Sequence, residues 1–236
     1  MSARSAAQPL AATRAALAAL AAFALPQRCP ACGGPADPSR LLCEPCRVAI
    51  PVVPYALCSR CLVRGREPAG CRAHPGFAVH AAWLYDGAAR AFVHALKFGG
   101  RPRLAAAAAL ALAAALPAPR FDLVTAVPLH SLRRRVRGYN QAAVLADALS
   151  TALGVPYAPD LLARVKATGR QVGRGAARRR AALAGAFRIE RPAAAKGRSV
   201  LIVDDVMTTG ATLDACLAAL AAAGARAGAV VLAWAQ

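Results

Sequence analysis

The sequence predicts an α/β fold, with a parallel sheet flanked by helices, behind a small cysteine-rich module. Three observations carry this prediction. From Phe77 onward, apolar runs alternate with alanine-rich stretches, which is the pattern of strands joined by crossover helices. Seven of the eight cysteines fall within residues 27–76. The segment 199–213 reads as a buried strand, two carboxylates, a loop of small residues and a helix.

The 236 residues suffice for one domain of ordinary size with a small appended module. We therefore predict a cysteine-rich module over residues 27–76 and the α/β domain over residues 77–236. The opening residues 1–26 imitate a secretory signal, because arginines precede the apolar run Ala15 to Leu25. We interpret them as an amphipathic lead-in helix, since paired cysteines in CxxC spacing suit a reducing compartment. The expected location is cytoplasmic.

Composition restricts the class of protein without assigning a function. The hydrophobic fraction is 58%, but alanine dominates it. The longest apolar run, Leu104 to Pro117, is shorter than the roughly 20 residues that span a bilayer, so no membrane span is expected. The net charge of +19 makes nucleic acid or phosphorylated metabolites plausible partners. An excess of arginine and alanine also follows from a GC-rich coding bias, so charge alone names no partner.

The predicted elements of the second domain follow one another in strand and helix order. Strands are expected at residues 78–85, 122–127, 199–204 and 228–234, where β-branched and apolar residues cluster. Helices are expected at residues 88–98, 104–116, 140–153, 178–183 and 211–223. Gly224 suits the end of the last helix, because glycine adopts the left-handed conformation there.

The first cysteine set has the spacing C-x2-C-x10-C-x2-C, formed by Cys29, Cys32, Cys43 and Cys46. Two residues between thiolates let a tight turn direct both sulfurs to one ion, and two such turns complete a tetrahedral structural zinc site. Disulfide bonds are the alternative, but closely paired cysteines fit a metal better.

The second set has the spacing C-x2-C-x9-C-x2-H, formed by Cys58, Cys61, Cys71 and His74. It predicts a second zinc site. The alternative is that His74 is an ordinary loop histidine before Pro75 and that the three thiols bind nothing. Neither set has an open coordination position for water, so neither is expected to be catalytic.

The segment Ser199 to Leu213, SVLIVDDVMTTGATL, is the most informative part of the chain. The apolar run before the carboxylates suits a parallel strand buried on both faces, and ligands gather beyond the carboxyl ends of such strands. Asp204 and Asp205 stand at that end. The loop that follows offers backbone N–H groups and hydroxyls at a helix N-terminus, where phosphate is favoured. Its residues are Thr208, Thr209, Gly210, Ala211 and Thr212.

This segment resembles the 5-phosphoribosyl-1-pyrophosphate (PRPP) signature of type I phosphoribosyltransferases. The resemblance implies a type I phosphoribosyltransferase fold for residues 77–236. It implies that Asp204 and Asp205 are catalytic and hold the ribose 2- and 3-hydroxyls, with Mg2+ reached directly or through water. Val203 and the loop residues 208–212 would form the PRPP-binding strand end and the 5-phosphate site.

Further motifs narrow the resemblance to the competence protein ComF family. In order, they are ALKFGGR at residues 95–101, AVPLH at 126–130, RGYNQA at 137–142, and Gln171, Arg179 and Ala186-Phe187. The family pattern often has an asparagine where this chain has Ala182. The resemblance implies that Lys97, Pro128, Arg135 and Arg137 contribute to the PRPP cleft.

Alternatives for these residues remain open. Lys97 also suits capping of a helix C-terminus, and the arginine run from Arg133 to Arg137 also suits a solvated loop. Tyr139 is the best candidate for stacking on a DNA base, although a packed tyrosine is the simpler interpretation.

Two classes of function fit this sequence. In the first, the protein is a phosphoribosyltransferase that breaks the C1 to pyrophosphate bond of PRPP with Mg2+. In the second, it binds PRPP, a nucleotide or single-stranded DNA without turnover and serves DNA uptake in natural transformation, as the family resemblance implies. A third interpretation is an adaptor whose zinc module docks a partner such as a DNA-uptake helicase.

Overall fold

A computed structural model describes residues 28–36, 42–65, 71, 77–98, 104–117, 121–129, 138–166 and 176–236. Its main sheet has six strands in the order β2-β1-β3-β8-β7-β4. These strands are β1 (Ala56–Cys58), β2 (Arg64–Gly65), β3 (Ala78–Leu84), β4 (Leu123–Ala126), β7 (Ser199–Met207) and β8 (Arg226–Trp234). A second sheet pairs β5 (Leu162–Arg164) with β6 (Phe187–Ile189).

Four adjacent strands of the main sheet are parallel, because β3 pairs with β8, β8 with β7, and β7 with β4 in parallel register. The run Val200 to Val203 of β7 is fully buried, as the sequence predicted, and every residue of β4 is buried as well. The carboxyl ends of these strands therefore lie at one edge of the sheet. The predicted parallel α/β architecture is confirmed.

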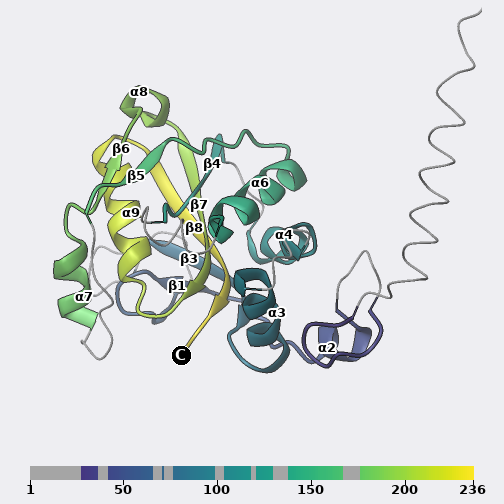
Figure 1. The fold of residues 1–236 in the computed structure, drawn as a ribbon. Coiled ribbons are helices and arrows are strands. Elements are labelled where there is room, and N and C mark those ends of the chain that lie inside the picture. The colour runs from purple at the N-terminus through teal and green to yellow at the C-terminus, as the bar shows by residue number, and fades with distance from the viewer. Residues whose placement is uncertain are drawn as a thin grey trace, which may run out of the picture.

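Helices cover both faces of the sheet (Figure 1). On one face lie α3 (Gly87–Phe98), α4 (Leu104–Ala115) and α6 (Gln141–Leu153). On the other lie α9 (Ala211–Ala222) and α7 (Ala176–Leu183), which pack on each other. The short helix α8 (Pro192–Ala195) precedes β7. Alanine permits close packing of these helices, and Leu112, Leu145 and Leu217 fill the core between helix and sheet.

The structure extends β7 beyond the predicted strand. The sequence predicts a strand end near Asp204, whereas β7 continues to Met207, which pairs with Trp234 of β8. Carboxylates are unfavourable in strands by composition, but the long neighbour β8 supplies hydrogen-bond partners that keep the strand extended. β5, β6 and α8 were not among the predicted elements, because three- and four-residue segments carry too little periodicity.

The sheet continues into the cysteine-rich segment. β1 pairs antiparallel with β3 through Leu57 and Val79, and β2 pairs with β1. The preceding chain also follows β3, since Val53 N–H donates to Ala82 O. Before it lies α2 (Glu44–Val48). The predicted lead-in helix over residues 1–26 lies outside the described residues, and within the described part no helix has the length and apolarity to cross a bilayer.

Candidate functional site

The predicted phosphate loop lies between the end of β7 and the start of α9. Gly210 is the residue before α9 and has φ +70°, a left-handed conformation that favours glycine. The N–H of Asp214 donates to the carbonyl of Gly210 over 2.8 Å and closes the first turn. Thr208 is exposed, Thr209 and Thr212 are half-buried, and Ala211 is buried. The loop thus presents threonine side chains and a helix N-terminus at one place.

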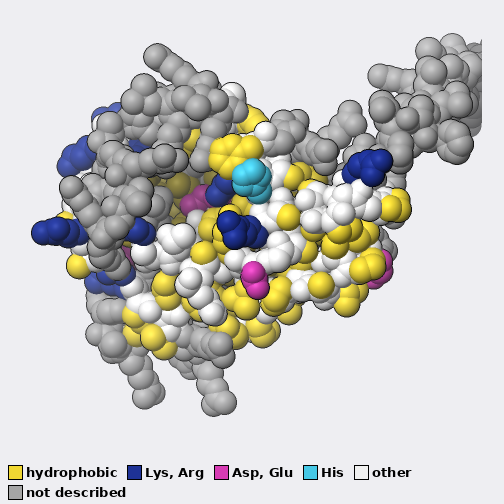
Figure 2. Space-filling view, turned by 60° about the horizontal axis from the view of Figure 1, so that its bottom comes forward, with side chains coloured by type: hydrophobic (Ala, Val, Ile, Leu, Met, Phe, Trp, Pro, Cys, Tyr) yellow, Lys and Arg dark blue, Asp and Glu magenta, His cyan; other side chains and the backbone are white. Residues whose placement is uncertain are grey.

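Asp204 and Asp205 adjoin this loop at the carboxyl edge of the sheet. Asp205 is 9% exposed, and its N–H donates to the Asp204 carboxylate over 2.8 Å. Burial, together with the charge of Asp205, raises the pKa of Asp204 to about 7. Figure 2 brings this edge forward and shows a hollow that contains acidic and basic side chains. Two neighbouring carboxylates in such surroundings favour a cation or hydroxyl groups as partners.

Lys97 supplies the cation in the free protein. Its Nζ lies 3.1 Å from Asp205 Oδ1, and both side chains are largely buried. The ion pair brings the end of α3 to the end of β7, 108 positions later in the chain. Lys97 therefore points into the site and not back along its own helix, which disfavours the alternative in which it only caps α3.

The RGYNQ motif holds this corner through its described residues. Tyr139 Oη donates to the carbonyl of Leu96, and Gln141 Nε2 lies 3.5 Å from the carbonyl of Lys97. Asn140 donates through Nδ2 to Val127 O over 3.0 Å, while its Oδ1 accepts from Ala142 N–H and caps α6. The motif thus anchors the end of α3 and the end of β4. The half-buried Tyr139 fits the packed interpretation better than a base-stacking one.

Pro128 follows β4 beside β7. The N–H of Val127 donates to Val203 O over 3.0 Å, so Pro128 stands next to the strand end that carries Asp204. Val203 itself is fully buried, and its side chain therefore offers no surface to a ligand. Arg135, Arg137, the rest of the arginine run, Gln171 and His74 lie outside the described residues.

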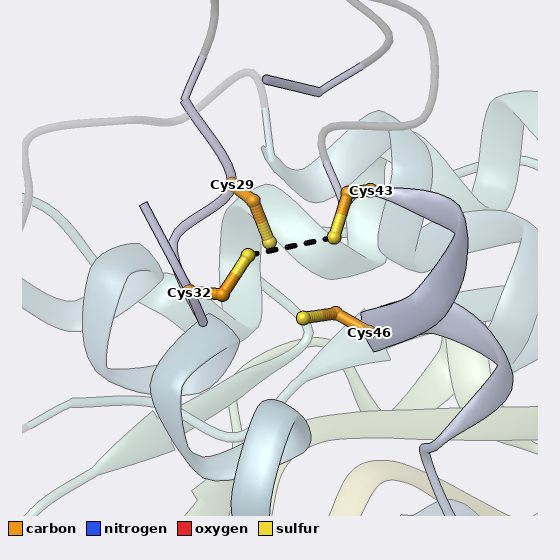
Figure 3. A group of neighbouring side chains, drawn as sticks. All are labelled: Cys29, Cys32, Cys43 and Cys46. Carbon is orange, nitrogen blue, oxygen red and sulfur yellow. Dashed lines mark hydrogen bonds between the residues drawn. The ribbon is translucent and has the colours of Figure 1, made fainter. Parts of the chain in front are cut away.

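The first cysteine set forms a cluster of four sulfurs. Their ligand atoms all lie within 4.8 Å of one another, and Figure 3 shows the four side chains converging on one point. Cys32 and Cys43 Sγ are 3.5 Å apart, near the roughly 3.8 Å expected between thiolates of a tetrahedral zinc site. The first CxxC turn is closed by Gly33, whose N–H donates to Cys29 O and whose φ is +74°. This cluster can hold a zinc ion.

The thiol of Cys29 is already favoured as a thiolate. Its burial by itself raises the pKa, but backbone groups of Cys43, Cys32 and Ala31 oppose this and bring the pKa down to about 6. The side-chain hydrogen bond with Cys43 raises the pKa of Cys46. Of these two thiols, Cys29, on the buried side of the cluster, is therefore the more readily ionised.

The second cluster unites Cys58, Cys61 and Cys71, whose ligand atoms also lie within 4.8 Å of one another. Cys61 and Cys71 Sγ are 3.6 Å apart. The turn from Cys58 is closed by two hydrogen bonds, Leu62 N–H to Cys58 O over 2.9 Å and Cys58 N–H to Val63 O over 3.1 Å. Leu62 has φ +61°, a value that non-glycine residues rarely adopt. The predicted fourth ligand, His74, is not described.

Comparison with known proteins identifies the family. A relative from Escherichia coli O6:H1, the DNA utilization protein YhgH, is 33% identical over 193 residues, which cover 78% of this chain and 80% of the relative. The chain therefore belongs to the ComF family. Competence protein F of Haemophilus influenzae is 41% identical over 97 residues, which cover 39% of this chain and 41% of that protein.

A further YhgH relative, from Salmonella typhi, is 39% identical over 130 residues; the chain spans 56% of its length. The family model described as phosphoribosyl transferase domain matches residues 140–235 of this ComF-type chain. The match covers β7, the loop and α9, so the phosphoribosyltransferase fold predicted from the signature is confirmed.

Among solved structures, the glutamine PRPP amidotransferase from B. subtilis with ADP and GMP aligns with 59% of the chain and 30% of its own, at 21% identity and a TM-score of 0.40. Adenine phosphoribosyltransferase from Thermoanaerobacter pseudethanolicus aligns with 57% of this ComF-type chain and 81% of its own, at 16% identity and a TM-score of 0.37.

Sequence reasoning missed a polar group beside the loop of this ComF-type site. Asp214, in the first turn of α9, is 7% exposed and accepts from Ser59 Oγ over 2.8 Å and from Arg60 Nε over 3.2 Å. Ser59 and Arg60 are the two residues between Cys58 and Cys61. A carboxylate in an otherwise apolar helix indicates that another polar side chain pairs with it. The partner is 155 positions away and could not be found from the sequence.

Proposed function

We propose that this ComF-family protein binds PRPP with Mg2+ at residues 204–212 and serves DNA uptake in natural transformation. The observation that carries the proposal is the meeting of Asp204, Asp205 and Lys97 at the strand end that leads into the phosphate loop. Hydroxyl-binding carboxylates, a cation and a helix N-terminus are the groups that a phosphorylated sugar requires.

The relatives support the biological setting. Their names, DNA utilization protein and competence protein F, refer to the use of DNA and to competence. The match with the phosphoribosyl transferase domain supports PRPP as the ligand. We place the protein in the cytoplasm, where its cysteine clusters would remain reduced and able to hold zinc.

The donor set fits Mg2+. This ion takes oxygen ligands, and Asp204 and Asp205 offer two neighbouring carboxylates whose mutual repulsion a cation relieves. When bound, Mg2+ would neutralise charge on the diphosphate of PRPP. Asp204 and Asp205 would orient the ribose hydroxyls, and the N–H groups and hydroxyls of residues 208–212 would hold the 5-phosphate.

The roles of the two arginines are proposed from the family resemblance. Arg135 and Arg137 would bind the pyrophosphate through their guanidinium forks. If the pyrophosphate leaves, these cations, with Lys97, would stabilise the charge on its oxygens, and the two carboxylates would stabilise the ribosyl cation.

The alternative is binding of a nucleotide or single-stranded DNA without turnover, with the zinc module docking an uptake helicase. The net charge of +19 favours this alternative. Against it stands Tyr139, the best stacking candidate, whose hydroxyl is engaged by Leu96.

Calorimetric titration of the zinc-loaded protein with PRPP and Mg2+ tests the proposal. We expect magnesium-dependent binding that is lost in the double variant Asp204→Asn, Asp205→Asn. Asp160→Asn is the control, because that side chain is 82% exposed and lies outside residues 204–212. Absence of binding by the wild type would contradict the proposal, and salt-dependent binding of single-stranded DNA by the same protein would then favour the alternative.

A further inference from the structure

The second cysteine turn packs directly on the phosphate loop. A Cβ placed on Gly210 would lie 2.1 Å from the carbonyl oxygen of Ser59 and 3.3 Å from Leu62 Cδ2. Such a distance is far below van der Waals contact, so the loop approaches the backbone of the cysteine turn as closely as a glycine allows. The segment Cys58–Leu62, here named the second knuckle, therefore forms one wall of the loop.

Polar contacts join the same two segments. Ser59 is fully buried; its hydroxyl donates to Asp214 Oδ1 over 2.8 Å and accepts from Phe77 N–H over 3.0 Å. Arg60 Nε lies 3.2 Å from Asp214 Oδ2. On the far side, Arg180 of α7 donates to the carbonyl of Arg60. The second knuckle is thus held between α7, β3 and α9.

The charge of Asp214 gives these contacts a role in phosphate binding. Asp214 lies one turn after Gly210, at the end of α9 that attracts anions. An unpaired carboxylate there would repel a bound phosphate. Ser59 and Arg60 together satisfy both of its oxygens, and the positive charge of Arg60 offsets its negative charge.

The shape of the second knuckle depends in turn on the cysteine cluster. Leu62 is held in a left-handed conformation, and Ser59 and Arg60 stand between two of the clustered thiols. Residues held in sparsely populated conformations persist only where the surroundings determine them. A metal ion bound by Cys58, Cys61 and Cys71 would hold the segment in this conformation. Loss of the ion would release the segment that carries Ser59 and Arg60.

We propose that Ser59, Arg60 and Asp214 are positioning residues through which metal binding at the second cysteine cluster sets the affinity of the phosphate loop for its ligand. The inference rests on the proposed function for the identity of that ligand. Because coupling between two sites is reciprocal, PRPP binding must strengthen metal binding at this cluster by the same factor.

The first test compares two arginines, each of which stands in a CxxC region and pairs with an acid. PRPP affinity is measured with Mg2+ for Arg60→Gln and for the control Arg47→Gln, whose partner Glu44 lies on α2. Figure 1 shows α2 well away from α9. We expect Arg60→Gln to weaken binding about tenfold and Arg47→Gln to bind as the wild type. Adding Asp214→Asn to Arg60→Gln should recover most of the loss, because it removes the unpaired charge.

The second test uses Cys71→Ser to remove one sulfur of the second cysteine cluster, and zinc content is measured on the same samples. Hydrogen exchange is followed in residues 206–216 without PRPP, beside the wild type. Faster exchange in this segment, with the sheet still protected, is the expected result. If Cys71→Ser fails to fold, Arg60→Gln and its rescue decide the question.

Failure of the two proposals can be distinguished. If the wild type binds no PRPP, the proposed function fails and the exchange experiment alone decides the coupling. If the wild type binds PRPP, wild-type affinity of Arg60→Gln together with unchanged exchange in Cys71→Ser overturns the coupling and leaves the proposed function standing.

Discussion

The two cysteine clusters share the CxxC spacing but stand in different surroundings. The first cluster is carried by a turn and by the short helix α2, and its polar neighbours are local: Arg47 pairs with Glu44 three positions before it. The second is built onto the sheet, with Cys58 at the end of β1, and its polar neighbours come from α9 and α7. The same spacing thus lies beside the short helix α2 in one place and beside the candidate site in the other.

This difference shows that spacing indicates a candidate metal site but not its role. The first cluster joins the hydrophobic core through Cys29 and Leu42, but its described polar contacts are local, so we expect loss of its metal to affect mainly its own segment. Where the residues between the cysteines contact a loop, as Ser59 does in the second cluster, we expect loss of the metal to disturb that loop as well. Three predictions test this difference and one tests the carboxylate beside the loop, from the largest expected effect to the smallest.

Loss of the second metal site should destabilise the protein more than loss of the first. Cys71→Ser frees Ser59 and Arg60 from α9, whereas Cys43→Ser frees mainly α2 and the adjoining turn. The measurement is urea unfolding of zinc-loaded samples, with zinc content determined for each. A larger loss for Cys43→Ser would show that the first cluster, despite its local contacts, supports the domain.

Gly210→Ala should be the most damaging single methyl addition in the site. The new Cβ would overlap Ser59 O, and a non-glycine residue would have to hold φ +70°. We expect a loss of about 3–5 kcal/mol in the free energy of unfolding. Gly154→Ala is the matched control, because its φ is +65° but no atom lies within 4 Å of the added Cβ. Its expected loss is about 1 kcal/mol, and equal losses would contradict contact with the second knuckle.

The Asp204 carboxylate of β7 should lower stability at neutral pH. Burial and Asp205 raise the pKa of Asp204 from 3.8 to about 7, so the folded state binds a proton that the unfolded state has released. The stability that this proton binding contributes to the folded state is fully present below pH 3.8 and is lost as the pH rises through about 7.

Asp204→Asn removes that dependence. In buffer without Mg2+, the variant should gain on the order of 2 kcal/mol relative to wild type between pH 5 and pH 8. Asp122→Asn, at the other end of β7, is the control and should keep the wild-type slope, because Asp204 is still present. An unchanged slope in Asp204→Asn would refute the raised pKa.

The two arginine pairs should give the smallest effects on stability. Arg60→Gln leaves Asp214, whose side chain is only 10% exposed, with one fewer partner. The expected loss is about 1 kcal/mol in the free energy of unfolding. Arg47→Gln affects two side chains that are each about half exposed, and no measurable change is expected. Equal losses would place the two clusters in equivalent surroundings.

Most of the fold was predictable because its signals are local. The apolar run Val200 to Val203, the carboxylates after it and the helix from Ala211 lie within 24 positions of one another, and each has a physical preference of its own. The first cysteine set was predictable for the same reason. The length of β7 was not, because its last residues are held by pairing with β8.

By itself, the sequence determined the parallel α/β architecture, the position of the loop between β7 and α9 and the grouping of cysteines, since each depends on residue type and short spacing. Only the tertiary structure decided which side chains meet there. Lys97 reaches Asp205 across 108 positions, and Ser59 reaches Asp214 across 155. Such contacts depend on the packing of whole helices and strands, and a buried carboxylate states only that a partner is needed, not where it lies.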